Sequence, residues 1–366
     1  MKRAAITVFT SFSGQGGVER MVLNLVEAFV RQGIQVDLLA LKGDSEHLRE
    51  LGDGVNLIRL KARHSSTVVA ELAQYLRREK PAAMLVAKDR PGRAALRARR
   101  RAGVNTRIVI RLGTNLSAAM AHKPRWQQWL RQRPLRHGYR GVDAIVAVSH
   151  GVAEDARRVT GVAAEKIHVI RNPVVTPKML EAAREPATHP WFGQQGRPVI
   201  LGAGRLTEQK DFAMLIRAFA RLQEKTAARL IILGDGSKRQ ELASLISELQ
   251  LTELVDLPGF QRNPHAWMRA ADLFVLSSRW EGSPNVLTEA IALGTPVVST
   301  DCPSGPAELL QNGRFGPLVP VGDDRQLAEA MSQVLNHPMD RDSLQAAAAD
   351  YTADNAAKSY WRLCQP

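Results

Sequence analysis

The sequence predicts an α/β protein of two domains, each a parallel sheet covered by helices. Three observations support this prediction. The chain has 366 residues, a length more natural for two domains than for one. Strand-like apolar runs alternate with helical stretches in both halves, the pattern from which parallel sheets are built. Between the halves, residues 173–197 are rich in proline and lack a strong apolar run, which is typical of a linker.

The first domain is expected to span residues 1–172. Its first strand covers 4–10, and after a short loop a helix follows over 18–32. The helix is predicted because apolar residues recur there at spacings of three and four, and Gly33 ends the pattern. Further strands are expected at 36–41, 55–60, 83–86, 107–111, 144–148 and 167–170.

The second domain is expected to span residues 198–350 and repeats the alternation, with helices over 212–222 and up to about residue 250. A last helix within 351–366 comes too late for the second sheet, so we expect it to pack back on the first domain. Two Rossmann-like domains of this kind normally face each other across a cleft that holds the ligand at the carboxyl ends of the strands. The strands are expected at 198–202, 228–233, 254–257, 273–276 and 295–300.

Positive charge is concentrated in the first half. The chain has 50 Lys and Arg against 36 Asp and Glu, a net charge of +14. Residues 1–200 hold 34 against 16, and 51–150 alone hold 21 against 5, whereas residues 201–366 hold 16 against 20. The first domain is therefore expected to meet an anionic partner, with nucleic acid, an acidic membrane surface and a phosphate-bearing substrate all open.

Composition also indicates a compartment. Two cysteines, Cys302 and Cys364, cannot build a disulfide framework, which favours a reducing compartment. No apolar run approaches the roughly 18 residues of a membrane span. The run that follows Lys2 and Arg3 ends too early for a secretory signal. We therefore expect a cytoplasmic protein.

The segment from Trp280 to Gly294 predicts an anion site at a helix start. Ser283 suits the N-cap, Pro284 the first helical position and Gly294 the C-terminal stop. The backbone amides of the next three residues would then point out of the helix toward a phosphate. These residues are Asn285, Val286 and Leu287.

Two acids flank that helix start, Glu281 before it and Glu289 within it. A carboxylate beside a phosphate site is repelled unless it bonds neutral hydroxyls, such as those of a sugar or a ribose. The alternative is a well-capped helix with two exposed acids.

A second segment, 202–211, directly follows a strand and supplies cations. Arg205 offers a planar fork and Lys210 a point charge, and both suit a diphosphate. The alternative is a solvated loop whose cations pair with Glu208 and Asp211. A third segment, the glycine-containing loop 14–17, lacks the full dinucleotide-binding fingerprint but fits the wall of a phosphate site.

In order and spacing, these pieces resemble the retaining glycosyltransferases of family 4, which have the GT-B fold of two Rossmann-like domains. The resemblance runs through most of the chain. Its elements are Gly16-Gly17-Val18-Glu19-Arg20, Val148-Ser149, Arg171-Asn172-Pro173-Val174, Gly204-Arg205 through Lys210-Asp211-Phe212, Gly234-Asp235-Gly236, Leu257-Pro258-Gly259-Phe260, the Glu281/Glu289 pair and Asp301 to Glu308.

The resemblance implies an enzyme that moves a hexose or N-acetylhexosamine from a nucleotide diphosphate sugar, with UDP expected, to a glycan or lipid-linked acceptor. It implies catalytic roles for Arg205 and Lys210, which hold the diphosphate and stabilise the leaving group, and for Glu281 at the transferred sugar. The remaining donor-site residues would be Glu289 at the ribose, Gly234 and Phe260 near the base, and the amides of Gly16, Gly17, Asn285, Val286 and Leu287.

No cofactor and no metal are expected. The cations and the helix start would neutralise the leaving group, and no His/Cys cluster has metal-ligand spacing. Asp340-Arg341-Asp342 is interpreted as an N-cap rather than a metal motif.

One departure from the family concerns the acceptor side. The family's usual histidine after the fourth or fifth strand is absent, since the sequence there runs from Arg111 to Asn115. Arg111, Asn115 and His150 are therefore candidates to bond the acceptor or the sugar. The alternative is a strand-end cation and a turn former.

Two basic clusters point to a membrane surface. Arg99, Arg100 and Arg101 end one helical stretch, and Trp126 and Trp129 lie three apart among cations in another. These residues are expected to face anionic lipid at the inner face of the plasma membrane, unless the tryptophans belong to the core. Rival functions are a nucleotide-sugar epimerase or hydrolase on the same fold and a basic nucleic-acid-binding module. The latter lacks interleaved aromatic residues, and no nucleic acid is expected.

Overall fold

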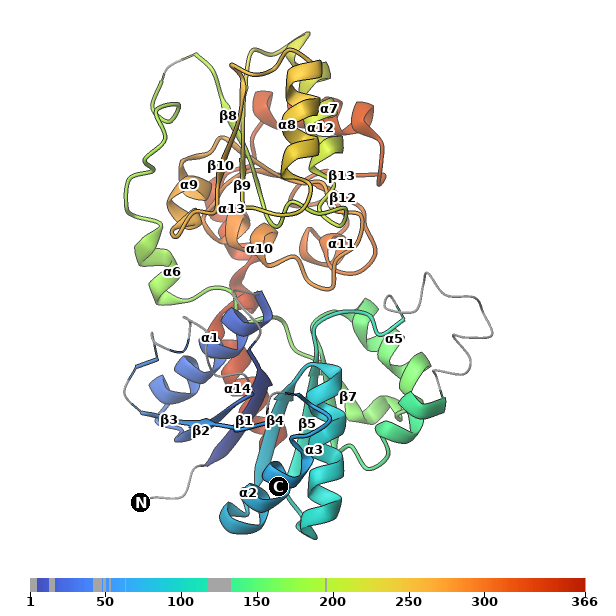
Figure 1. The fold of residues 1–366 in the computed structure, drawn as a ribbon. Helices are drawn as coiled ribbons and strands as arrows, with labels where there is room; N and C mark the ends of the chain where they lie inside the picture. Colours follow the sequence, from blue (N-terminus) through green and yellow to red (C-terminus); the bar gives the residue numbers. More distant parts are fainter. Residues whose placement is uncertain are drawn as a thin grey trace. The chain divides into compact units, whose positions relative to one another are not determined.

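The computed structural model describes residues 5–12, 17–41, 48, 51–52, 54–62, 64–117, 133–194 and 196–365. These fall into two compact units (Figure 1). The first unit comprises Met1–Val174 together with Tyr351–Pro366, and the second comprises Val175–Asp350. The chain passes from one unit to the other twice, near residues 174 and 351.

The first unit contains a seven-stranded sheet in the order β3-β2-β1-β4-β5-β6-β7. All neighbouring strands are parallel. The predicted strands are confirmed, with their ends shifted by at most two residues. They are β1 (Ile6–Ser11), β2 (Val36–Leu41), β3 (Val55–Arg59), β4 (Ala83–Ala87), β5 (Arg107–Leu112), β6 (Ala144–Ala147) and β7 (Ile167–Val169).

Strand residues in this sheet alternate between two apolar cores, one on each face. In β4, Ala83, Leu85 and Ala87 belong to one core, and Met84 and Val86 belong to the other. Buried parallel strands have apolar residues on both faces for this reason. Helices α1 (Gly17–Arg31) and α14 (Ala353–Cys364) pack on the first core. The second core includes α2 (Val69–Glu79), α3 (Asp89–Ala102) and α5 (His150–Thr160), and η3 (Ala164–Lys166) precedes β7.

The C-terminal helix α14 is part of the first unit. Thr352 caps it by accepting from the amide of Asn355 at 3.3 Å. Tyr360 is completely buried against the first core. Arg107 of β5 donates to the carbonyl of Leu363 at 2.7 Å. The end of the chain is thus fixed to the sheet that began it (Figure 1).

The second unit contains a six-stranded parallel sheet in the order β10-β9-β8-β11-β12-β13. The sequence did not predict β13, because two residues are too few to show a pattern. The strands are β8 (Val199–Ala203), β9 (Arg229–Leu233), β10 (Val255–Gly259), β11 (Leu273–Leu276), β12 (Val297–Thr300) and β13 (Leu318–Val319).

Helices α7 (Phe212–Gln223), α8 (Arg239–Glu248) and α12 (Asp324–Asn336) share one core with this sheet. Asp340 caps α13 (Arg341–Ala347) by accepting from the amide of Ser343 at 2.9 Å, so the predicted N-cap is confirmed. The remaining helices are α9 (Pro264–Ala270), α10 (Asn285–Ala292), α11 (Pro306–Leu309), α13 (Arg341–Ala347) and η4 (Ala349–Tyr351).

The stretch predicted as a linker carries structure of its own. It contains α6 (Pro177–Ala182), whose N-cap Thr176 accepts from the amide of Met179 at 3.1 Å. Further on, the ring of His189 lies 5.5 Å from that of Trp267 in α9, and its Nε2 lies 3.0 Å from a carboxylate oxygen of Asp256. The proline-rich stretch from Val175 onward therefore packs on the second unit.

Candidate functional site

The topology of the second sheet determines where its site lies. The chain adds strands to one side of β8, as β9 and β10, and then returns to place β11 on the other side. The loops that follow β8 and β11 consequently begin at adjacent points of the carboxyl edge, where open α/β sheets bind ligands. These loops, 204–211 and 277–284, overlap the two segments that the sequence analysis identified, 202–211 and 280–294.

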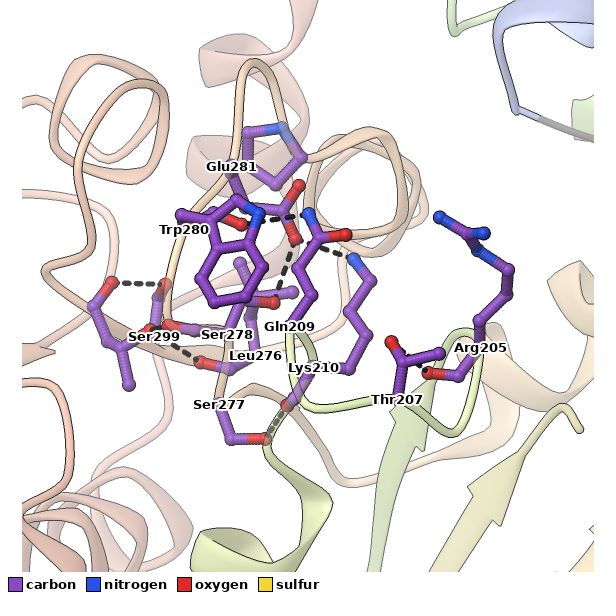
Figure 2. A network of polar contacts seen from close by, with 12 residues as sticks. Arg205, Thr207, Gln209, Lys210, Leu276, Ser277, Ser278, Trp280, Glu281 and Ser299 are labelled. Carbon is purple, nitrogen blue, oxygen red and sulfur yellow. Dashed lines mark hydrogen bonds and ion pairs between the residues drawn. The ribbon is translucent and has the colours of Figure 1, made fainter. Parts of the chain in front are cut away.

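An ion pair joins the two loops. The Lys210 ammonium donates to a carboxylate oxygen of Glu281 at 2.6 Å, and the hydroxyl of Ser278 donates to the same oxygen at 2.8 Å (Figure 2). The side chains of Lys210 and Glu281 are 16% and 8% exposed. The structure thus brings together two predicted residues that lie 71 positions apart. It also excludes the alternative in which Glu281 is an exposed surface acid.

A second set of bonds holds the two loops in register. Arg279 donates from Nε to Asp211 at 2.8 Å, and its amide donates to the carbonyl of Gln209 at 2.8 Å. Gln209 donates in turn to the carbonyl of Trp280 at 2.9 Å (Figure 2). Asp211 also caps α7 by accepting from the amide of Met214. Both Lys210 and Glu281 are therefore supported by rigid neighbours, and Asp211 does not pair with Lys210.

Glycine permits the close contact of the loops that follow β8 and β9. A Cβ added at Gly234, where φ is +125°, would lie 2.0 Å from the carbonyl oxygen of Gly204. The amide of Gly234 donates to the carbonyl of Gly259 at 2.9 Å. This amide is therefore part of the sheet edge. What the structure assigns to Gly234 is a packing role, and base binding there stays a prediction.

The helix start differs from the prediction. Pro284, in extended conformation, is the N-cap of α10, which begins at Asn285, and Ser283 lies outside the helix. The Leu287 amide donates to the carbonyl of Pro284 at 3.1 Å, so it closes the first turn instead of pointing outward. The N-cap prediction for Ser283 is therefore wrong. The phosphate role of the Leu287 amide, which bonds within the helix here, stays a prediction. Gly294 follows the helix with a φ of +74°, as predicted for the stop.

Glu289 of α10 faces a histidine that the sequence analysis missed. Glu289 is 5% exposed, and its Oε1 lies 3.8 Å from Nε2 of His265. His265 is the second residue of α9, which Asn263 caps. A lone histidine at a helix start gives no sequence signal, since its partner comes from a helix 24 positions away.

The loop that follows β12 brings Cys302 to Glu281. Burial together with that carboxylate raises the pKa of the Cys302 thiol to about 12.

Three side chains at this edge are exposed. Arg205 is exposed, and its guanidinium lies apart from the Lys210–Glu281 pair in Figure 2. Phe260, directly after β10, is 56% exposed, and Trp280 is 40% exposed. Trp280 directly precedes Glu281, and an exposed aromatic face beside a buried ion pair suits the stacking of a base or a sugar.

The first unit has a charged cluster at the equivalent point of its own sheet, between β1 and β4. Lys88 donates to the carbonyl of Ser11 at 2.7 Å and lies 3.7 Å from Glu19, which is buried. Desolvation, with a contribution from the charge of Arg111, lowers the pKa of Lys88. Arg111, at 4% exposed, donates to Asn172 at 2.5 Å, while its Nε and Nη1 are buried without a hydrogen-bond partner among the described residues.

The other acceptor candidates lie elsewhere in the first unit. His150 is the exposed first residue of α5, and Asn115 lies just beyond β5. Both make further polar contacts. Their acceptor roles, like that of Arg111, stay predictions. Gly17 is the first residue of α1, whereas Gly16 lies outside the described residues.

The membrane-facing assignment of Arg99 is wrong. Its side chain is 17% exposed and pairs with Asp143, and it also donates to the carbonyls of Thr106 and Gly141. Arg99 is thus a structural clamp at the end of α3. Arg100 and Arg101 are exposed, and Trp126 and Trp129 lie outside the described residues. No helix in the described part of the chain is long and apolar enough to cross a membrane.

Two family models match the chain. The glycosyl transferase 4-like domain matches residues 16–173, and glycosyl transferases group 1 matches residues 197–337. The chain is 30% identical over 339 residues to the lipopolysaccharide core biosynthesis glycosyltransferase LpsE of Rhizobium meliloti, covering 88% of this chain and 87% of that protein. It is 35% identical over 248 residues to an N-acetylgalactosamine-N,N'-diacetylbacillosaminyl-diphospho-undecaprenol 4-alpha-N-acetylgalactosaminyltransferase of Campylobacter jejuni, covering 68% of this chain and 65% of that protein.

For two curated relatives, the chain spans less than two thirds of their own lengths, 28% and 65%. Among solved structures, Anabaena HepE in complex with UDP superposes with a TM-score of 0.77 at 20% identity, covering 97% of this chain and 98% of that one. That likeness shows the fold. The chain therefore belongs to the group 1 glycosyl transferases with a glycosyl transferase 4-like N-terminal domain, and it has their GT-B fold of two Rossmann-like domains.

Proposed function

We propose that this protein is a retaining glycosyltransferase that moves a hexose or N-acetylhexosamine from a UDP-sugar to a glycan or lipid-linked acceptor without a metal. The observation that carries the proposal is the Lys210–Glu281 pair at the carboxyl edge of the second sheet. Glycosyl transfer requires that the charge developing on the departing diphosphate be stabilised by groups already in place. Lys210, held by its rigid loop, and the exposed Arg205 supply this stabilisation.

Glu281 supplies the sugar contact. Its carboxylate accepts from Lys210 and Ser278 through one oxygen, so the charge is balanced without using all of its acceptor capacity. A sugar hydroxyl can bond the remaining lone pairs as a neutral donor. Phosphate at Lys210 and sugar at Glu281 would place the bond between them over the ion pair. Glu289, buried in the second turn of α10, is the matching contact for the ribose hydroxyls.

The relatives support the donor and acceptor classes. One relative's name describes transfer of N-acetylgalactosamine to a diphospho-undecaprenol-linked sugar, and another's describes lipopolysaccharide core biosynthesis. The similar Anabaena structure holds UDP. We propose that the second unit binds the UDP-sugar and that the basic first unit takes the acceptor. Action at the inner face of the plasma membrane, as a peripheral protein in the cytoplasm, accords with that charge.

The proposal is tested by donor protection and product analysis. A UDP-sugar should raise the unfolding temperature of the wild type, while Glu289→Ala should weaken this protection because the ribose contact is lost. Product formed with a suitable acceptor should keep the donor's anomeric configuration, read from NMR coupling constants, and EDTA should leave the rate unchanged. Failure of UDP-, GDP- and ADP-sugars alike to protect would overturn the donor site. Release of free sugar or an epimer without any acceptor would overturn transfer.

Membrane association has a separate test. Vesicles containing anionic lipid should co-sediment the protein, and Arg100→Gln/Arg101→Gln should reduce the bound fraction. Equal sedimentation of both proteins would contradict an association through these side chains.

A further inference from the structure

A groove lined by arginines runs beside α3 in the first unit, whereas the proposed donor site belongs to the second unit. Its main part is a cavity of about 750 Å³, and a second cavity of about 290 Å³ shares Arg93 and Arg97 with it. We name the two together the arginine groove. Seven arginines line it: Arg90, Arg93, Arg97 and Arg100 from α3, and Arg133, Arg136 and Arg140 from the segment 133–140.

The four α3 arginines form one stripe because their spacings are three, four and three. Helical residues at such spacings lie on the same face. The opposite face of α3 is apolar, and Ala94, Ala95 and Ala98 are completely buried. Like charges placed in this way destabilise a helix. Apart from Arg93, which pairs with Asp89, the stripe therefore does not serve the fold.

The floor of the groove is built rigidly around Arg93. Arg93 donates from Nε and Nη2 to both oxygens of Asp89, at 2.9 and 2.7 Å, and the Tyr139 hydroxyl donates to Asp89 at 2.9 Å. A Cβ added at Gly138 would lie 2.5 Å from Cδ of Arg93. Glycine there allows the segment 133–140 to approach α3, which brings the two rows of arginines together.

The groove has a large excess of positive charge. None of the described residues that line the two cavities is acidic. Within the described ranges, Arg90, Arg97, Arg100 and Arg140 form no ion pair. Among the described residues, Arg136 donates to the carbonyl of Arg158, at 3.5 Å. Arginine presents a planar fork of N–H donors that matches phosphate oxygens, and several forks around one hollow match several phosphates.

We propose that the arginine groove binds a ligand with two or more neighbouring phosphate groups. The concave shape and volume favour a phosphate group that projects into the protein over a flat bilayer surface. An acceptor that carries a diphosphate or several phosphates has this chemistry. The identification of the ligand as the acceptor rests on the proposed function, whereas the binding of phosphates does not.

The test is calorimetric titration of the full chain with inorganic pyrophosphate and, separately, with orthophosphate at the same ionic strength. Arg97→Gln/Arg136→Gln removes one fork from each side of the groove. Arg217→Gln/Arg269→Gln, two exposed arginines of the second unit, makes the same change in net charge elsewhere. A third variant, Arg205→Gln, shows how much of the pyrophosphate binding belongs to the proposed donor site.

We expect wild type to bind pyrophosphate at least about tenfold more tightly than orthophosphate, because two phosphates engage two forks. The groove variant should lose about tenfold or more, and the control pair should stay near wild type. Arg205→Gln should keep the groove-dependent binding and lose only the pyrophosphate that binds at the proposed donor site. Unchanged affinity in the groove variant, or loss of binding in Arg205→Gln alone, would overturn the proposal.

Vesicles with about 30% phosphatidylglycerol distinguish a lipid source. Vesicle binding that depends on Arg97 and Arg136 while pyrophosphate does not bind would also overturn the proposal, in favour of a membrane surface. The proposed function can fail separately: groove-dependent pyrophosphate binding would stand even if no nucleotide sugar protects the protein.

Discussion

The two sheets have similar topologies but different chemistry at their carboxyl edges. In both, a lysine–glutamate pair lies where the strand order reverses. In the second unit, Lys210 and Glu281 are 2.6 Å apart and a serine hydroxyl supports the carboxylate. In the first unit, Lys88 and Glu19 are 3.7 Å apart, and burial, with a smaller contribution from the charge of Arg111, lowers the pKa of Lys88.

The difference lies in the charge balance. At the edge of the second unit, the charges of the lysine and the glutamate cancel and hydrogen bonds hold both side chains. A ligand there meets a few groups in fixed positions. The first unit's edge has two cations for one acid, and the arginine groove adds a larger positive excess on the same unit. The overall charge of +14 therefore belongs to the unit proposed to take the acceptor, and the donor phosphate is handled without it. Four predictions test this division.

The largest effect is expected for Lys210→Ala. The substitution should lower kcat by about 10²–10³-fold, the size of effect seen when one transition-state donor is removed. It also leaves Glu281 buried without its counter-charge. Steady-state kinetics with a UDP-sugar checks this. Lys238→Ala, which removes an exposed lysine paired with Glu241, is the control and should change kcat little; a comparable loss in both variants would contradict a special role for Lys210.

The second prediction concerns the close contact of the loops at the donor edge. Gly234→Ala should lower the free energy of unfolding by about 3 kcal/mol, because the added Cβ would overlap the Gly204 carbonyl and φ is +125°. Gly322→Ala, with a φ of +86° and open space around it, should cost about 1 kcal/mol through backbone strain alone. Chemical denaturation measures the free energy of unfolding of both variants. Equal losses would contradict the prediction, because they would show that the two loops move apart to accommodate the added Cβ.

The third prediction uses the thiols, one in each unit. Burial raises the pKa of Cys302 and of Cys364 to about 12 from an ordinary 9.0. Both thiols stay protonated in the folded protein while the unfolded chain ionises, so their contribution to stability is complete below pH 9 and is lost as pH rises toward 12. When the pH rises from 9 to 10, the free energy of unfolding of Cys302→Ala should therefore fall by about 1 kcal/mol less than that of the wild type. Parallel pH profiles of the two proteins would contradict this.

The smallest effect lies in the arginine groove. Arg97→Gln should raise the free energy of unfolding by about 0.5 kcal/mol, since it relieves repulsion with arginines three and four positions away. Arg93→Gln should instead lower it, because Arg93 pairs with Asp89 and forms the floor. If denaturation shows that Arg97→Gln raises the free energy of unfolding and Arg93→Gln lowers it, the result would support a role of the stripe in ligand binding. A loss of stability in both variants would indicate that the stripe stabilises the helix.

The sequence predicted most of this fold because local patterns control it. Alternating apolar strands and spaced helical residues located every strand except β13, within two residues. The stretch 173–197 was harder, because α6 and the contact of His189 with Trp267 depend on partners remote in sequence. Similarly, α10 begins one residue later than predicted, because Pro284 is its N-cap. The Leu287 amide therefore donates to the Pro284 carbonyl within the first turn of the helix.

For the site, the sequence predicted residue types but not their pairing. Lys210 and Glu281 were expected in separate roles, and only the adjacency of β8 and β11 brings them together. His265 and the pairing of Arg99 with Asp143 were missed for the same reason, since neither partner is local. Charge counts located the excess in the first half, but only the contact of Gly138 with Arg93 explains how α3 and the segment 133–140 form a groove.

The central claim is that Lys210 meets the diphosphate and Glu281 meets the sugar. Calorimetric titration with UDP and with the UDP-sugar that protects best tests it directly. We predict that Lys210→Ala weakens the binding of both ligands, whereas Glu281→Gln weakens the UDP-sugar and leaves UDP nearly unchanged. Equal weakening of UDP and UDP-sugar by Glu281→Gln, or unchanged UDP binding in Lys210→Ala, would contradict the account.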